Sequence, residues 1–226
     1  MNFHAKQLHH VEGILRLESH ADTALLARSM LEGLCLLKWA AQEPVTRPLT
    51  WRAFSLVIDW RTLRKDVAVG VPEADAKVHQ LEERIAEHGD DLLNSKAIDS
   101  RSRGVPPPSD PYVKTWYKPQ LRQIFEAVGA SELYDGPYYQ MSEWHHWSAG
   151  GLAQAMRFDD QMMSFSPRSP MIQTASLANA YQCLAETAQL VDEHFELNAA
   201  AEIAEMINAF VAEHAALSAR PQSNDR

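Results

Sequence analysis

Apolar residues recur at helical spacing along most of the chain, and this pattern predicts its order of helices. From His4 to Gln42 no Pro interrupts the pattern, so we expect one long helix or two helices that meet near Ser19-His20. Later stripes predict helices over roughly 51–69, 73–94, 120–128, 138–148, 170–197 and 199–219. Short turns between successive helices favour an all-α bundle of about seven to nine mostly antiparallel helices.

The clearest interruption of this pattern runs from Ser95 to Pro111. Turn formers, charges and three consecutive prolines predict a long, exposed and mobile Pro-rich loop over 95–111. It is either a tolerated insertion or a lid that would use Arg101 and Arg103 on an anion. We expect a single all-helical domain over 1–219 and a disordered tail over 220–226.

Composition and charge narrow the class of protein. Of 226 residues, 46% are hydrophobic and 23% are charged, which is typical of a globular protein, and the two cysteines indicate a reduced, cytoplasmic one. No stretch predicts a membrane span. The net charge of −9 leaves no bulk basic patch for nucleic acid. Residues 171–218 hold seven acids and no Lys or Arg, which predicts either a solvated face or a docking surface for a basic partner.

Two sets of polar residues stand on otherwise apolar helices. Arg28 and Glu32 lie one helical turn apart, so we expect them to pair with each other. Tyr138, Ser142 and His145 or His146 share a face of a second helix. Each set needs hydrogen-bond partners, and the sequence therefore predicts that Arg28 contacts the second helix.

The same residues carry a resemblance to a known family. Ala27-Arg28-Ser29-Met30-Leu31-Glu32 resembles the A-R-S-x-L-E signature of an uncharacterised bacterial family of all-helical domains. Tyr138, Ser142, His146 and Ser148 resemble its second signature, Y-x-x-x-S-x-x-x-H-x-S, with Trp147 where the family often has Pro. The resemblance spans roughly residues 10–200. It implies an all-α fold in which Arg28, Glu32, Ser142 and His146 meet, and it implies no activity.

Two classes of function fit these residues. In the first, Arg28, Glu32, Tyr138, Ser142 and His146 form a structural polar network in a binding module that takes a protein partner or self-associates. In the second, a ribonuclease-like helical bundle uses His146 as general base, Arg28 on the phosphate charge and Ser142 to orient it. The sequence predicts no cofactor and no metal, because adjacent histidines on a helix rarely chelate one ion.

Overall fold

A computed structural model describes residues 2–17, 20–146, 148–159, 162–165 and 170–218. The chain divides into two compact units, unit 1 (residues 1–38 and 125–226) and unit 2 (residues 39–124). Each is described by itself below, and the single domain over 1–219 stays a prediction. The tail predicted over 220–226 and Trp147 lie outside the described residues.

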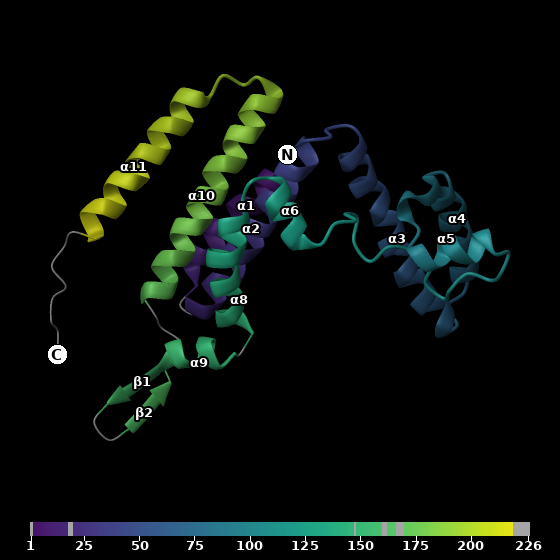
Figure 1. The fold of residues 1–226 in the computed structure, drawn as a ribbon, viewed down its shortest axis with the longest axis horizontal. Helices are drawn as coiled ribbons and strands as arrows, with labels where there is room; N and C mark the ends of the chain where they lie inside the picture. The colour runs from purple at the N-terminus through teal and green to yellow at the C-terminus, as the bar shows by residue number, and fades with distance from the viewer. Residues whose placement is uncertain (1, 18–19, 147, 160–161, 166–169, 219–226) are drawn as a thin grey trace. The chain divides into compact units, whose positions relative to one another are not determined.

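Unit 1 holds the long helices at the two ends of the chain (Figure 1). Its elements are α1 (Asn2–Arg16), most of α2 (His20–Ala41), α7 (Ser131–Leu133), the π-helical turn η2 (Tyr134–Tyr138), α8 (Tyr139–His145), α9 (Ala149–Ala155), β1 (Met156–Asp159), β2 (Met162–Phe165), α10 (Pro170–Phe195) and α11 (Ala200–Ser218). Helix α1 packs on α10, and α11 returns beside α10. The two strands form an antiparallel hairpin with Met156 opposite Phe165.

Helix α2 is the core of unit 1, because its buried side chains point in nearly every direction. The fully or nearly fully buried ones within this unit are Ala24, Ala27, Met30, Leu31, Leu34, Cys35 and Leu36. Helix α1 approaches closely at Gly13, where an added Cβ would lie 3.0 Å from a methyl carbon of Leu26. Gln7 donates a hydrogen bond of 3.0 Å to the Met30 carbonyl. On the α10 side, Lys38 pairs with Glu186.

Unit 2 is built on a helical pair. Its elements are α3 (Thr46–Ala68), α4 (Ala74–Ala86), the 3-10 turn η1 (Gly89–Leu92) and α5 (Ser95–Ser102). Helices α3 and α4 pack against each other. The core residues between them and the following loop are Ala53, Phe54, Val57, Trp60, Val78, Leu81, Ile85, Leu92 and Tyr112. Helix α6 (Leu121–Ala127) begins in this unit and ends in unit 1, and the chain then turns at Gly129, whose φ is 72°.

The all-α class is confirmed. Of the two alternatives for the first helical region, the structure has two helices, since α1 ends at Arg16 and α2 begins at His20. Several predicted boundaries were wrong. The helix predicted over 73–94 ends at Ala86, and Gly89–Leu92 form the separate 3-10 turn η1. Helix α3 begins at Thr46 rather than near Trp51, because Pro48 lies in its first turn, where a proline leaves no hydrogen bond unmade. The first part of the predicted loop is helix α5, since the Asn94 side chain caps it by accepting from the Ala97 N–H at 2.9 Å.

The helices of the described ranges were compared with the length and hydropathy that a membrane span requires. None of them has a stretch long and apolar enough to cross a bilayer.

Candidate functional site

The first candidate site of unit 1 is created by the turn η2. Pro137 lies inside this turn, and a proline lacks the N–H that an α-helix needs there. The backbone widens into a π-helical turn, a feature that is often found at functional sites. The turn ends at Tyr138, whose side chain is buried. This turn over residues 134–138 is therefore the element that positions Tyr138.

Tyr138 joins the two polar residues of α2. The Arg28 guanidinium donates to the Tyr138 hydroxyl at 2.9 Å, and that hydroxyl lies 3.5 Å from a Glu32 carboxylate oxygen, to which it donates. The guanidinium carbon also stands 4.9 Å from the centroid of the Tyr138 ring. These three residues, which we call the tyrosine network, link helix α2 to the start of α8.

The tyrosine network corrects one expectation. In the described part of the chain no ion pair joins Arg28 to Glu32, although they stand one turn apart, because each reaches the Tyr138 hydroxyl instead. Burial raises the pKa of Tyr138, although the hydrogen bond from Arg28 opposes this. The hydroxyl therefore stays protonated at neutral pH, as a donor to Glu32 must be.

Aromatic rings hold Tyr138 in place. The Tyr134 ring stacks on it with a centroid separation of 5.2 Å, and the Phe125 ring lies 5.4 Å away. The Phe125 side chain is fully buried. One nitrogen of Arg28, Nε, is buried without a hydrogen-bond partner among the described residues. Packing of the aromatic rings therefore fixes the position of the Tyr138 hydroxyl between Arg28 and Glu32.

The remaining predicted residues are not part of this network. The Ser142 hydroxyl donates to the Tyr138 carbonyl of its own helix at 2.8 Å. His146 ends α8 through its backbone N–H, which donates to the Ser142 carbonyl at 3.0 Å, and its side chain is exposed. Ser148 donates to the Glu143 carbonyl at 3.1 Å, and His145 lies against His146. Arg28, Glu32 and Tyr138 meet, whereas no hydrogen bond in the described residues joins the His146 side chain to them.

A second feature of unit 1 is the outer face of α11. The sequence assigns Ile203, Met206, Ile207, Phe210 and Val211 to its core stripe. Phe210 stacks on Tyr181 of α10 at 3.7 Å, but Met206 is 38% exposed and Val211 is 58% exposed, so both are wrong as core residues. Helix α11 carries apolar side chains beyond the face that α10 covers.

The described residues contain no group of three or more His, Cys, Asp or Glu side chains that is arranged to hold a metal ion. The two cysteines are free and buried.

The chain is therefore an all-α protein whose unit 1 contains a tyrosine network at a π-helical turn. Residues 1–163 match the Family of unknown function (DUF5677), and the chain belongs to this family. No curated protein and no solved structure matches the chain.

Proposed function

We propose that this protein is a non-catalytic interaction module that binds a basic amphipathic helix of another protein. The docking surface is a row of exposed side chains on the outer face of α11, which we call the α11 seam. Its members are Ala201, Ala204, Asn208, Val211 and Ala215.

The spacing of the α11 seam carries the proposal. Its members follow one another at intervals of three, four, three and four residues, which is the heptad spacing of a helix that packs on another helix. A helix that is apolar on most sides is normally buried on most sides. Within the described residues, α10 is the element packed on α11, and it covers the opposite side through Phe210. The alanines would let a partner helix approach closely, and the Val211 side chain would pack between the apolar side chains of that helix.

The negative charge of unit 1 favours a basic partner. Residues 171–218 hold seven acids and no Lys or Arg, and unit 1 as a whole has 18 acidic and 8 basic residues. A second copy of α11 would bring like charges to the seam, which is unfavourable. A partner helix with lysine or arginine beside its apolar stripe would be attracted and steered to this surface.

The tyrosine network supports a structural role for the predicted site residues. Arg28 and Glu32 are engaged by Tyr138, and Ser142 by its own helix. A general base needs hydrogen-bond reach to the group that it activates, beside the groups that stabilise charge. The exposed His146 has no such link to Arg28, so the ribonuclease-like alternative gains no support from this geometry.

The test is a titration with two synthetic probes of 21 residues. Both have leucine at heptad positions a and d, and the remaining positions are lysine in one and glutamate in the other. We expect the lysine peptide to bind the full-length protein and the glutamate peptide to bind at least about tenfold more weakly, as measured by fluorescence anisotropy.

One variant separates apolar docking from mere charge attraction. Val211→Glu adds a negative charge, so it would strengthen a purely electrostatic complex, but it would weaken docking on the seam by about tenfold or more. Val69→Glu is the matched control, since Val69 is 78% exposed and lies in unit 2. Equal or tighter binding by Val211→Glu would refute the proposal. So would a wild-type dimer that Val211→Glu dissociates, because the seam would then take a second copy.

A further inference from the structure

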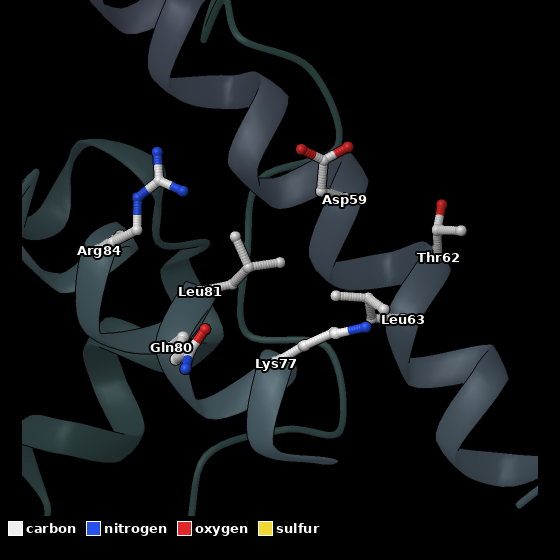
Figure 2. A pocket seen from close by; sticks show the side chains of 7 residues that line it. All are labelled: Asp59, Thr62, Leu63, Lys77, Gln80, Leu81 and Arg84. Atoms are coloured by element: carbon white, nitrogen blue, oxygen red, sulfur yellow. The ribbon is translucent and has the colours of Figure 1, made fainter. Parts of the chain in front are cut away.

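Unit 2 contains an open groove between α3 and α4, which shares no residue with the tyrosine network or the α11 seam (Figure 2). Its volume is about 420 Å³, within the range of small-molecule sites in proteins. The residues that line it are Asp59, Thr62 and Leu63 on α3 and Lys77, Gln80, Leu81 and Arg84 on α4.

The groove has an apolar floor. Leu81 is 8% exposed and belongs to the core of unit 2, and the partly buried Leu63 packs against that core. Lys77, Leu81 and Arg84 follow one another at helical spacing along one side of α4. The floor is therefore fixed by the helix pair itself, and the polar groups stand along its rims.

The rims carry both signs of charge at one end. Figure 2 shows Asp59 of α3 and Arg84 of α4 toward one end of the groove, while Lys77 extends from α4 toward Leu63. Across the described residues, the side chains of Asp59, Lys77 and Arg84 make no ion pair or hydrogen bond with the protein.

Other charges of unit 2 do find partners. Arg61 pairs with Asp110 at 2.9 Å, and Arg103 pairs with Asp99 at 2.9 Å. The groove thus presents an unpaired carboxylate and an unpaired guanidinium on opposite rims, with apolar surface between them.

We propose that this groove binds a small zwitterion with an apolar body, of the class of a free α-amino acid with an aliphatic side chain. Arg84 would take its carboxylate, since the planar guanidinium matches a carboxylate with two parallel hydrogen bonds. Asp59 would accept from its ammonium group. The aliphatic side chain would lie on Leu63 and Leu81, where it leaves water. This site is separate from the proposed partner surface on α11 and does not depend on it.

The experiment removes each charge from both the ligand and the protein. The probes are L-leucine, 4-methylpentanoate, which lacks the ammonium group, and 3-methylbutylamine, which lacks the carboxylate. Binding to the full-length protein is followed by NMR chemical-shift titration. We expect L-leucine to bind with a Kd of about 0.1–5 mM, and each analogue to bind at least about fivefold more weakly.

Two variants assign the ends of the ligand. Arg84→Gln should weaken L-leucine binding by about tenfold and leave the binding of the amine unchanged. Asp59→Asn should weaken L-leucine binding by a similar factor and leave the binding of the carboxylate unchanged. Lys65→Gln is the matched control: it removes a positive charge from α3 outside the groove lining and should change the Kd for L-leucine less than about twofold. All three side chains are exposed, so the variants should fold like the wild type.

Three results would overturn the proposal. The first is no L-leucine binding up to about 20 mM. The second is 4-methylpentanoate binding as tightly as L-leucine, which would make the groove a simple anion site. The third is an equal loss of binding in Lys65→Gln and Arg84→Gln, which would indicate a diffuse charge effect.

Discussion

Replacing Tyr138 by phenylalanine tests whether the tyrosine network holds unit 1 together. The substitution keeps the ring, and with it the contacts to Tyr134 at 5.2 Å and Phe125 at 5.4 Å, but it removes the hydroxyl. Arg28 then loses its acceptor at 2.9 Å, and Glu32 loses a donor. Both charged groups are half-buried, so water replaces the lost hydrogen bonds only in part.

The expected cost follows from the hydrogen bonds lost. A hydrogen bond to a charged group contributes about 1.5–3 kcal/mol, so the free energy of unfolding should fall by about that amount. In a chain of this size each kcal/mol lowers the melting temperature by about 2–4 °C, which gives a shift of about 3–12 °C. Thermal and urea denaturation followed by circular dichroism measure both quantities.

The control is the neighbouring tyrosine. Tyr139 is 59% exposed, and its hydroxyl has no partner within the structurally described ranges, so Tyr139→Phe should change stability by less than about 0.5 kcal/mol. A double-mutant cycle with Arg28→Met should give a coupling energy of about 0.5–3 kcal/mol. If Tyr138→Phe unfolds like Tyr139→Phe and the coupling is zero, the structural role of the network is refuted.

Further predictions concern single residues. His146→Ala should change stability by less than about 0.5 kcal/mol, because the side chain is exposed; metal-independent RNA cleavage by the wild type that this folded variant lacks would revive the ribonuclease-like alternative. Burial raises the pKa of Cys35 to about 12 and that of Cys183 also upward, so neither thiol should react with a disulfide reagent at pH 8 until the protein unfolds; rapid labelling of the native protein would contradict this. Burial raises the pKa of Tyr112 to about 12, so the stability that depends on its protonated hydroxyl is complete below pH 10. As the pH rises from 10 toward 12, the free energy of unfolding should fall by about 1.4 kcal/mol per pH unit, and Tyr112→Phe should lack this decrease. An equal decrease in Tyr112→Phe would disprove the prediction. Trypsin should cut the native protein first after Arg103, where α5 has ended and the Pro-rich stretch begins. If mass spectrometry of the digest shows an earlier cut at another site, the mobile loop is refuted.

Local patterns predicted the helices, but not every boundary. Helix α10 is visible in the sequence, because apolar periodicity reports directly on a buried helix face, whereas for α1 and α2 the sequence allowed either one long helix or two. The start of α3 at Thr46 has no clear signal in the sequence, because a proline such as Pro48 fits both the end of one helix and the first turn of the next. Helix α5 was missed because its serines and charges resemble a turn, whereas the cap at Asn94 is a single side-chain hydrogen bond.

The candidate site was predicted as a set of residues but not as a geometry. Spacing on one helix indicated an Arg28–Glu32 pair, while the actual partner, Tyr138, lies 106 residues beyond Glu32. Only the packing of the π-helical turn on α2 brings its hydroxyl between them. The groove of unit 2 also depends on contacts between elements that spacing along one helix does not predict. Asp59 and Arg84 lie on different helices, and the pairing of α3 with α4 that places them on one groove has no signal in either helix alone.

The proposed interaction surface can be located directly by hydrogen–deuterium exchange of the full-length protein with and without the lysine peptide. The free protein should exchange the amides of α11 faster than those of α10, since α11 is covered on one side only. Saturating peptide should slow exchange in α11 by about tenfold or more and leave α3 and α4 unchanged. Protection that appears in α3 or α4 while α11 stays unchanged would contradict the account.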